Sequence, residues 1–296
     1  MSERKNEWMK TSWPLLFWTL LAAHLGFAGD PDGLQIIDVH THTWFSGKLE
    51  PTSRIPLTEA EYFQEMKDAG IVAAIAHTTP ASILSGVEGG YRDLRKKNVI
   101  HCLGLRAKEQ EKELEDELKS GKYGCLKIYL GYIHQYAYDE NYLPAYRLAE
   151  KFKIPVVFHT GDTYSATALL KYAHPLTIDE VAVKYPQVTF VIAHAGNPWI
   201  RSAAEVAYKN PNVYLDLSAF GIGDLRKQSQ QKLNTYIIEP LKWIYGYVDN
   251  PKKLMFGSDW PLVQMKPYVA LVKKAVPKQH WKAVFHDNAA GVFKLF

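Results

Sequence analysis

From Gly33 to its end, the chain alternates short apolar runs rich in β-branched residues with amphipathic stretches of helical period. This alternation is typical of strand and helix units that build a parallel sheet. Eight strands over about 250 residues, each followed by a helix, predict an α/β fold of the (β/α)8 TIM barrel type, a single domain over residues 33–296. The predicted strands are Leu34–Val39, Ile71–Ala76, Val99–Leu105, Gly124–Leu130, Ile154–Phe158, Val188–Ala193, Val213–Leu217 and Lys253–Phe256.

A doubly wound open sheet is the alternative arrangement of such units. That fold would carry a glycine-rich phosphate-binding turn after its first strand. The residues that follow Val39 contain no such turn, so the sequence favours the barrel.

The predicted helices have readable ends. Thr58-x-x-Glu61 forms a capping box and Gly70 a stop signal, while Thr177-x-x-Glu180 opens a helix that ends before Pro186. Further helical stretches cover 107–120, 141–152 and 225–245, the last being the longest. No linker or repeat interrupts the series.

The composition excludes several classes of protein. A hydrophobic content of 47% in 296 residues excludes disorder, and 35 Lys and Arg against 31 Asp and Glu give a formal net charge of +4 without basic runs, so no nucleic acid partner is expected. The two cysteines, Cys102 and Cys125, form no disulfide framework, and we expect both to be buried free thiols.

The first 28 residues differ from the rest of the chain. A modestly basic lead precedes the apolar run Trp13–Leu21 and a small-residue step at Gly26-Phe27-Ala28, which is typical of a secretory signal peptide. An uncleaved membrane anchor or an apolar helix packed on the barrel are the alternatives. A signal peptide would place the protein in the periplasm or outside the cell, and the alternatives would make it membrane-anchored or cytoplasmic; no stable membrane insertion of the barrel itself is expected.

Polar residues gather where the predicted strands end. His40 and His42 close the first strand and, with a strand period of two, share a face. His159, His194 and Asp259 follow the fifth, sixth and eighth strands. Because active sites of TIM barrels lie at the C-terminal ends of the strands, this pattern predicts a divalent metal site there, with Zn²⁺ favoured and Mn²⁺, Fe²⁺ or Co²⁺ as alternatives.

These motifs resemble the amidohydrolase superfamily, in particular the amidohydrolase-related (amidohydrolase 2) branch that includes the aminocarboxymuconate-semialdehyde decarboxylases. The resemblance rests on the segments 37–42, 155–161, 190–199, 212–216 and 256–261 and extends over nearly all of residues 34–296. It implies that His40, His42, His159 and Asp259 bind the metal, with one ion favoured over two, and that His194 and Asp259 serve catalysis. The possibility that His194 binds a second metal ion stays open. The resemblance also implies, weakly, a homodimer.

Lys127 lies near the end of the fourth strand. In some branches of the superfamily a lysine on this strand is carboxylated and bridges two metals. Contact with an anionic substrate or a carboxylate, or a purely structural role, are the alternatives.

Other polar and aromatic side chains lie at or just beyond strand ends. The substrate-binding candidates are His77, Arg106, Tyr129, Asp162, Trp199 and Trp260, and we also consider His174, Asp216, Trp44 and Tyr132. Arg106 is the one arginine that we consider as a clamp for a substrate carboxylate. Asp216 is a candidate to orient a metal-binding imidazole.

Three functions are compatible with these residues. The first is hydrolysis of an amide, lactone or ester-like bond of a small organic molecule by a metal-activated water. The second is non-oxidative decarboxylation or hydration of an unsaturated or aromatic carboxylic acid at the same site. The third is a barrel that binds metal or sugar without catalysis.

Overall fold

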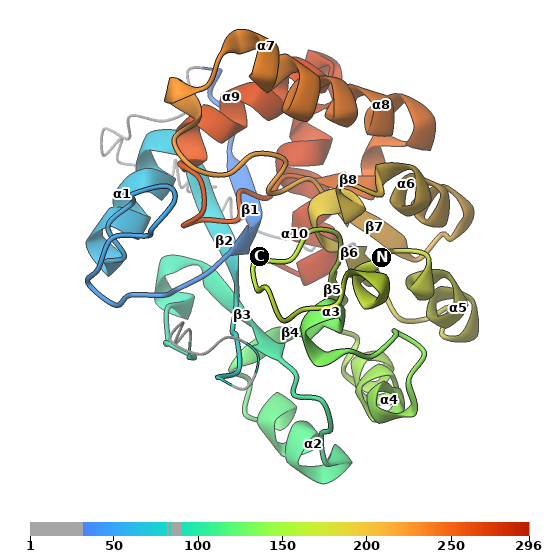
Figure 1. The fold of residues 1–296 in the computed structure, drawn as a ribbon. Helices are drawn as coiled ribbons and strands as arrows, with labels where there is room; N and C mark the ends of the chain where they lie inside the picture. The colour runs from blue at the N-terminus through green and yellow to red at the C-terminus, as the bar shows by residue number, and fades with distance from the viewer. Residues whose placement is uncertain (1–31, 82, 84–89, 296) are drawn as a thin grey trace, which may run out of the picture.

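The computed structural model describes residues 32–81, 83 and 90–295. Its eight parallel strands follow one another around a cylinder in chain order, with the helices outside them (Figure 1). Val39 N donates to Phe256 O (3.0 Å) and His42 N to Trp260 O (2.8 Å), which closes the cylinder between the first strand and the chain after the last. The predicted TIM barrel is confirmed. The strands are β1 (Ile36–Thr41), β2 (Ile71–His77), β3 (Val99–Gly104), β4 (Tyr123–Tyr129), β5 (Val156–His159), β6 (Phe190–Ile192), β7 (Val213–Asp216) and β8 (Leu254–Met255).

The predicted helix signals have mixed outcomes. The side chain of Thr58 caps α1, and Gly70 ends it with a φ of 75°. Thr177 begins α5 but does not cap it, because its hydroxyl accepts from Ala137 N instead. The α-helices are α1 (Glu59–Ala69), α2 (Glu111–Lys119), α3 (Leu130–Ile133), α4 (Leu143–Phe152), α5 (Thr177–Lys184), α6 (Ile200–Lys209), α7 (Gln230–Leu233), α8 (Glu239–Val248), α9 (Met265–Ala275) and α10 (Asn288–Phe293).

Two layers of apolar side chains hold the barrel together. The larger layer packs the helices on the outside of the strands. The smaller layer fills the barrel interior with residues such as Ile37, Val157 and Met255, and Phe293 of α10 packs against it. The interior is therefore a packed core, and the polar side chains described below lie together at one end of it.

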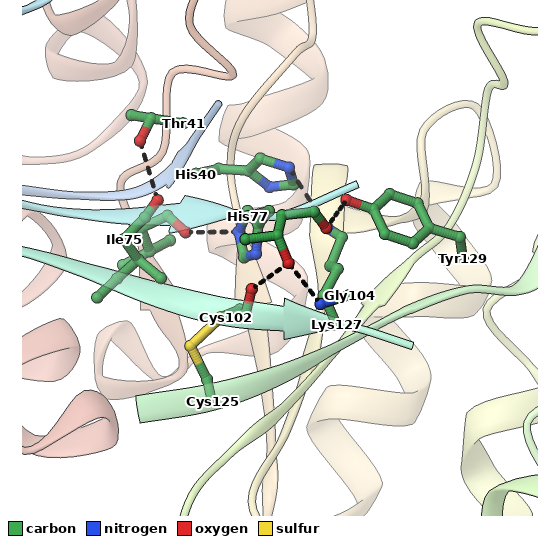
Figure 2. Close-up of a disulfide and its surroundings, with 11 residues drawn as sticks. His40, Thr41, Ile75, His77, Cys102, Gly104, Cys125, Lys127 and Tyr129 are labelled. Atoms are coloured by element: carbon green, nitrogen blue, oxygen red, sulfur yellow. Dashed lines mark hydrogen bonds between the residues drawn. A yellow bond between two sulfur atoms is a disulfide. The ribbon is translucent and has the colours of Figure 1, made fainter. Parts of the chain in front are cut away.

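Cys102 and Cys125 form a disulfide (Figure 2). They are register partners on the neighbouring strands β3 and β4, with their Cα atoms 4.4 Å apart, and both belong to the interior layer. The prediction of two free thiols is wrong, because the spacing of 23 residues along the chain does not reveal that the barrel places them side by side.

The predicted signal peptide or anchor, residues 1–28, lies outside the described residues. Within the part of the chain that the structure describes, no helix has the length and apolar character needed to cross a membrane.

Candidate metal centre and cavity

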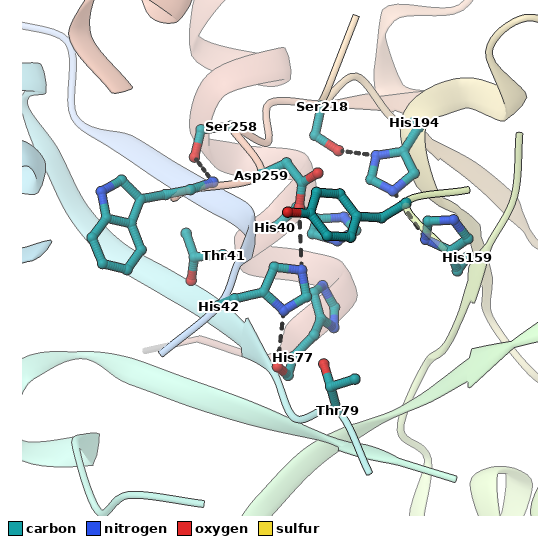
Figure 3. A network of polar contacts seen from close by, with 12 residues as sticks. His40, Thr41, His42, His77, Thr79, His159, His194, Ser218, Ser258 and Asp259 are labelled. Carbon is teal, nitrogen blue, oxygen red and sulfur yellow. Dashed lines mark hydrogen bonds and ion pairs between the residues drawn. The ribbon is translucent and has the colours of Figure 1, made fainter. Parts of the chain in front are cut away.

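Three of the predicted metal ligands meet at one end of the barrel (Figure 3). Asp259 Oδ1 lies 3.2 Å from His42 Nε2 and 3.5 Å from His40 Nε2. This oxygen is buried and accepts no hydrogen bond from a described residue. The three side chains, from β1 and the turns after β1 and β8, can hold a metal ion between them.

A local irregularity of β1 brings His40 to this position. Val39 packs in the barrel interior, so strict alternation would turn His40 outward. The register against β2 shifts between Asp38 and Thr41, and His40 instead faces inward beside His77, with the two ring centroids 4.3 Å apart. The two histidines do share one site, but the simple period of two is not the reason.

Hydrogen bonds fix which nitrogen of His40 faces the other ligands. His40 Nδ1 lies 2.5 Å from Asp216 Oδ2, at the end of β7. Because a carboxylate only accepts, Nδ1 carries the proton and Nε2 keeps its lone pair. A Cβ at position 257 would overlap Asp216 Oδ1, so the glycine beside this pair is a steric requirement.

The same carboxylate orients His194 through Ser218. Ser218 donates its hydroxyl to Asp216 Oδ2 (3.0 Å) and its backbone N–H to Oδ1 (2.9 Å). His194 Nδ1, 2.9 Å from Ser218 Oγ, must then be the donor. His194 Nε2 is consequently the lone-pair nitrogen, and it faces His159.

His42 is held in the same tautomer by the backbone. Its Nδ1 lies 3.2 Å from the carbonyl oxygen of His77 and donates to it, which leaves Nε2 free toward Asp259. The His77 ring itself donates from Nε2 to Val39 O (3.1 Å). His77 therefore supports the site from within the barrel.

His159 lies beside these ligands and not among the three. Its Nε2 donates to Asp162 O (2.9 Å), and its Nδ1 lies 3.3 Å from His194 Nε2. Two nitrogen lone pairs thus face each other, an arrangement that a shared proton or a nearby cation would stabilise.

Burial sets the charge of these groups. It lowers the pKa of His40 and His159 well below the ordinary value, and that of His194 to about 4. Burial raises the pKa of Asp259, but His42 and His194 lower it more, to about 2. Neutral imidazoles beside an ionised carboxylate are the forms that bind a divalent cation.

The backbone is strained at both predicted catalytic residues. His194 has a φ of 58° and Asp259 a φ of 71°, in the left-handed region that L residues rarely adopt. Such strain costs roughly 1–3 kcal/mol and persists at functional sites when the surrounding structure enforces it. At each position it turns the side chain at the end of its strand toward the other ligands.

Lys127 lies on β4 beneath the ligands and is fully buried. Its Nζ is 3.4 Å from His40 Nε2. Burial lowers the pKa of Lys127 to about 7, against the opposing effect of Asp216 and Asp259. It does not line the cavity, which disfavours direct contact with a substrate.

A cavity of about 230 Å³ opens beside the candidate metal centre. Its floor includes His42, His159, His194 and Asp259, and Tyr129 and Asp162 lie on its wall. The other described lining residues are Trp44, Thr79, Tyr132, Tyr164, Asn197, Ala219, Phe220, Gly221, Ile222 and Leu262.

Several predicted substrate-binding residues lie elsewhere. Arg106 pairs with Glu109 (2.7 Å) at the edge of a separate groove. Trp260 is fully buried against Tyr62, outside the barrel. Trp199 packs on His174, and neither lines the cavity. The position of a residue just after a strand therefore does not suffice to predict that it lines the cavity, because its side chain can also turn outward.

Sequence reasoning missed Ser218, Thr79, Tyr164 and Phe220. Ser218 had one available signal, since it stands two residues after Asp216 at the end of a predicted strand. Tyr164 and Phe220 lie in loops, whose course the strand pattern does not give.

Comparisons with known proteins identify the fold and the family of the chain. In curated proteins, 77 residues are 38% identical to protein fluG of Emericella nidulans, covering 26% of this chain and only 9% of that protein. Among solved structures, an uncharacterised TIM-barrel protein of Bordetella bronchiseptica has a TM-score of 0.69 at 20% identity, covering 88% of this chain and 99% of that one.

Two further solved structures contain metals. An amidohydrolase of Burkholderia multivorans with bound zinc has a TM-score of 0.64 at 17% identity, covering 88% of this chain and 100% of that one. A 5-carboxyvanillate decarboxylase of Novosphingobium aromaticivorans complexed with manganese has a TM-score of 0.62 at 14% identity, covering 90% of this chain and 98% of that one. These likenesses show a shared fold. Residues 37–295 match the amidohydrolase family, and the chain therefore belongs to that family of enzymes.

Proposed function

We propose that the protein is a metal-dependent hydrolase in which an activated water attacks an ester, lactone or amide bond of a small organic substrate. The observation that carries this proposal is the meeting of His40 Nε2, His42 Nε2 and Asp259 Oδ1 beside a cavity that His42, Asp259 and His194 line.

The donor set fits a divalent cation. Imidazole nitrogen and carboxylate oxygen suit Zn²⁺ and its first-row neighbours, and Asp259 Oδ1 is buried without a hydrogen bond from any described residue. A second grouping, His40 with His194 and Asp216, is already joined through hydrogen bonds that include Ser218. This arrangement favours one ion over two.

When bound, such a cation polarises a carbonyl and lowers the pKa of a water to about 7. His194 is the candidate for the base, because it lines the cavity, its Nε2 keeps a lone pair and burial keeps the ring neutral. It takes a proton from the attacking water and returns it to the oxygen or nitrogen of the leaving group. Proton transfer of this kind contributes typically about 10²–10⁴-fold to a rate.

Decarboxylation of a carboxylic acid is less well supported. Arg106, the predicted carboxylate clamp, forms ion pairs with Glu109 and Glu113 and does not line the cavity. The geometry therefore gives hydrolysis the stronger support.

The test is metal analysis of the purified full chain, followed by assays with lactones, esters, amides and aromatic carboxylic acids. We expect about one metal per chain, turnover of an ester or lactone, and loss of that turnover with a chelator. His194→Gln should lower kcat while metal content stays the same. Release of CO2 without hydrolysis, or a protein that binds no metal, would overturn the proposal.

A further inference from the structure

The cavity walls are aromatic and apolar. Trp44 stacks on His42 with ring centroids 4.3 Å apart, and Tyr132 meets the His159 ring edge-on at 5.0 Å. Phe220, Ile222 and Leu262 complete the apolar lining. A volume of about 230 Å³ is below the usual range for drug-sized ligands, so the group that fills it is small.

Among the described residues that line the cavity, the charged side chains are all acidic. Asp162 and Asp259 line it, and no Lys or Arg does. The two basic residues predicted at strand ends do not line the cavity either, because Arg106 pairs with Glu109 and Glu113 and Lys127 is buried beside His40. Residues 82–89, in the segment after β2, contain no Lys or Arg in the sequence.

One hydroxyl on the wall is free to donate a hydrogen bond. Tyr132 Oη accepts from Tyr164 N at 2.8 Å, so its own hydrogen is available to the cavity. Tyr129, in contrast, donates its hydroxyl hydrogen to Thr78 O at 3.0 Å. A neutral carbonyl or hydroxyl can be recognised by such a donor. An anionic group on the wall, away from the cation proposed at the floor, would lose its hydration with no Lys or Arg beside it among the described lining residues.

From this lining we infer that the substrate, apart from its reacting carbonyl, is a small uncharged and flat group, such as a neutral ring that carries a hydrogen-bond acceptor. The inference rests on the proposed function and narrows it to neutral esters, lactones or amides. The acidic and aromatic walls disfavour a substrate that carries a carboxylate away from the reacting bond.

Two esters of matched shape test the charge preference. 4-Carbamoylphenyl acetate and 4-carboxyphenyl acetate differ only by an amide in place of a carboxylate. We expect kcat/KM of the metal-loaded enzyme, divided by the uncatalysed rate for each ester, to be at least about 10-fold higher for the amide. An equal or higher value for the carboxylate would overturn the inference.

Binding separates this inference from the proposed function. If neither ester is hydrolysed, ester hydrolysis fails, but binding of 4-acetamidobenzamide and 4-acetamidobenzoate to the metal-free chain still decides the charge preference. Tryptophan fluorescence reports it, because Trp44 lines the cavity. Tighter binding of the benzamide supports the inference; tighter or equal binding of the benzoate, or binding of neither, overturns it.

A variant provides the converse test. Ile222 is 41% exposed at the cavity wall, and Ile222→Lys adds the missing cation there. Ile222→Lys should raise kcat/KM for 4-carboxyphenyl acetate, relative to kcat/KM for 4-carbamoylphenyl acetate, by about 10-fold or more. Val183→Lys, on the exposed face of α5, adds the same charge away from the cavity and should leave the ratio unchanged.

Discussion

Asp216 Oδ2 lies 2.5 Å from His40 Nδ1 and fixes the tautomer of that predicted metal ligand. The same oxygen accepts from Ser218 Oγ, which in turn holds His194 Nδ1. One carboxylate thus sets the tautomer of His40, a predicted ligand, and, through Ser218, that of His194, the predicted base.

This linkage predicts different defects in two variants. In Asp216→Asn an amide replaces the acceptor oxygen, so we expect metal affinity to fall about 10–100-fold and kcat to fall with it. Ser218→Ala removes the acceptor of His194 and one donor to Asp216 but leaves the Asp216–His40 hydrogen bond, so kcat should fall while metal affinity stays within about twofold. Competition with a chromophoric chelator measures affinity, and Ser218→Thr, which keeps the hydroxyl, is the matched control. Equal loss of metal in the Asp216 and Ser218 variants would contradict separate roles.

Lys127 is predicted to oppose metal binding. Its Nζ lies 3.4 Å from His40 Nε2, and burial lowers the pKa of Lys127 to about 7, so its positive charge grows as the pH falls through neutrality. Lys127→Met keeps the apolar stem and removes the charge. We expect one metal per chain and an affinity increased several-fold, most of all below pH 7, by elemental analysis and chelator competition. A native chain with two metals and a variant with one or none would instead support a carboxylated lysine.

The strand ends are the part of the site that the sequence predicts well. Parallel strands all end at one rim of a barrel, so His40, His159, His194 and Asp259 can be assigned to one rim without coordinates. The direction of each side chain is less accessible. His40 depends on a register shift in β1, and Trp260 turns into the outer layer although it follows Asp259 directly.

Contacts between neighbouring strands are beyond sequence reasoning for a related reason. Ser218, in the turn after β7, contacts His194 in the turn after β6, and Cys102 meets Cys125 only because β3 and β4 are neighbours in register. Local sequence patterns predict helices and strands, whereas these side-chain pairs depend on which strands lie next to each other in the sheet and in which register.

Removing the disulfide should destabilise the fold. Its loop of 23 residues corresponds to about 3 kcal/mol in the chain-entropy account, so Cys102→Ala/Cys125→Ala should lower the free energy of unfolding by about that amount. Urea unfolding of both proteins measures the difference. Both sulfurs belong to fully buried residues, so a mild reductant should change the native protein only once it unfolds.

The control is a thiol count in denaturant. No free thiol is expected in the native protein prepared under oxidising conditions, and two reactive thiols would contradict the disulfide.

Glu65 predicts a dependence of stability on pH that is independent of the metal centre. Its Oε2 accepts from Met265 N at the start of α9 (2.8 Å), and burial raises the pKa of Glu65 to about 7, above an ordinary 4.5. Between these values the folded state binds the proton and the unfolded state does not, so the free energy of unfolding falls as the pH rises from about 4.5 to 7.

Glu65→Gln keeps an acceptor oxygen and removes the charge. The free energy of unfolding of the variant should exceed that of the native protein by about 1–2 kcal/mol at about pH 8, a figure reduced because Glu65 is partly exposed. At about pH 5.5 the difference should be much smaller. Urea unfolding at both pH values measures this, with Glu150→Gln, exposed on α4, as the control. A Glu65→Gln advantage that does not grow with pH would show that the carboxyl is ionised in the folded protein without cost.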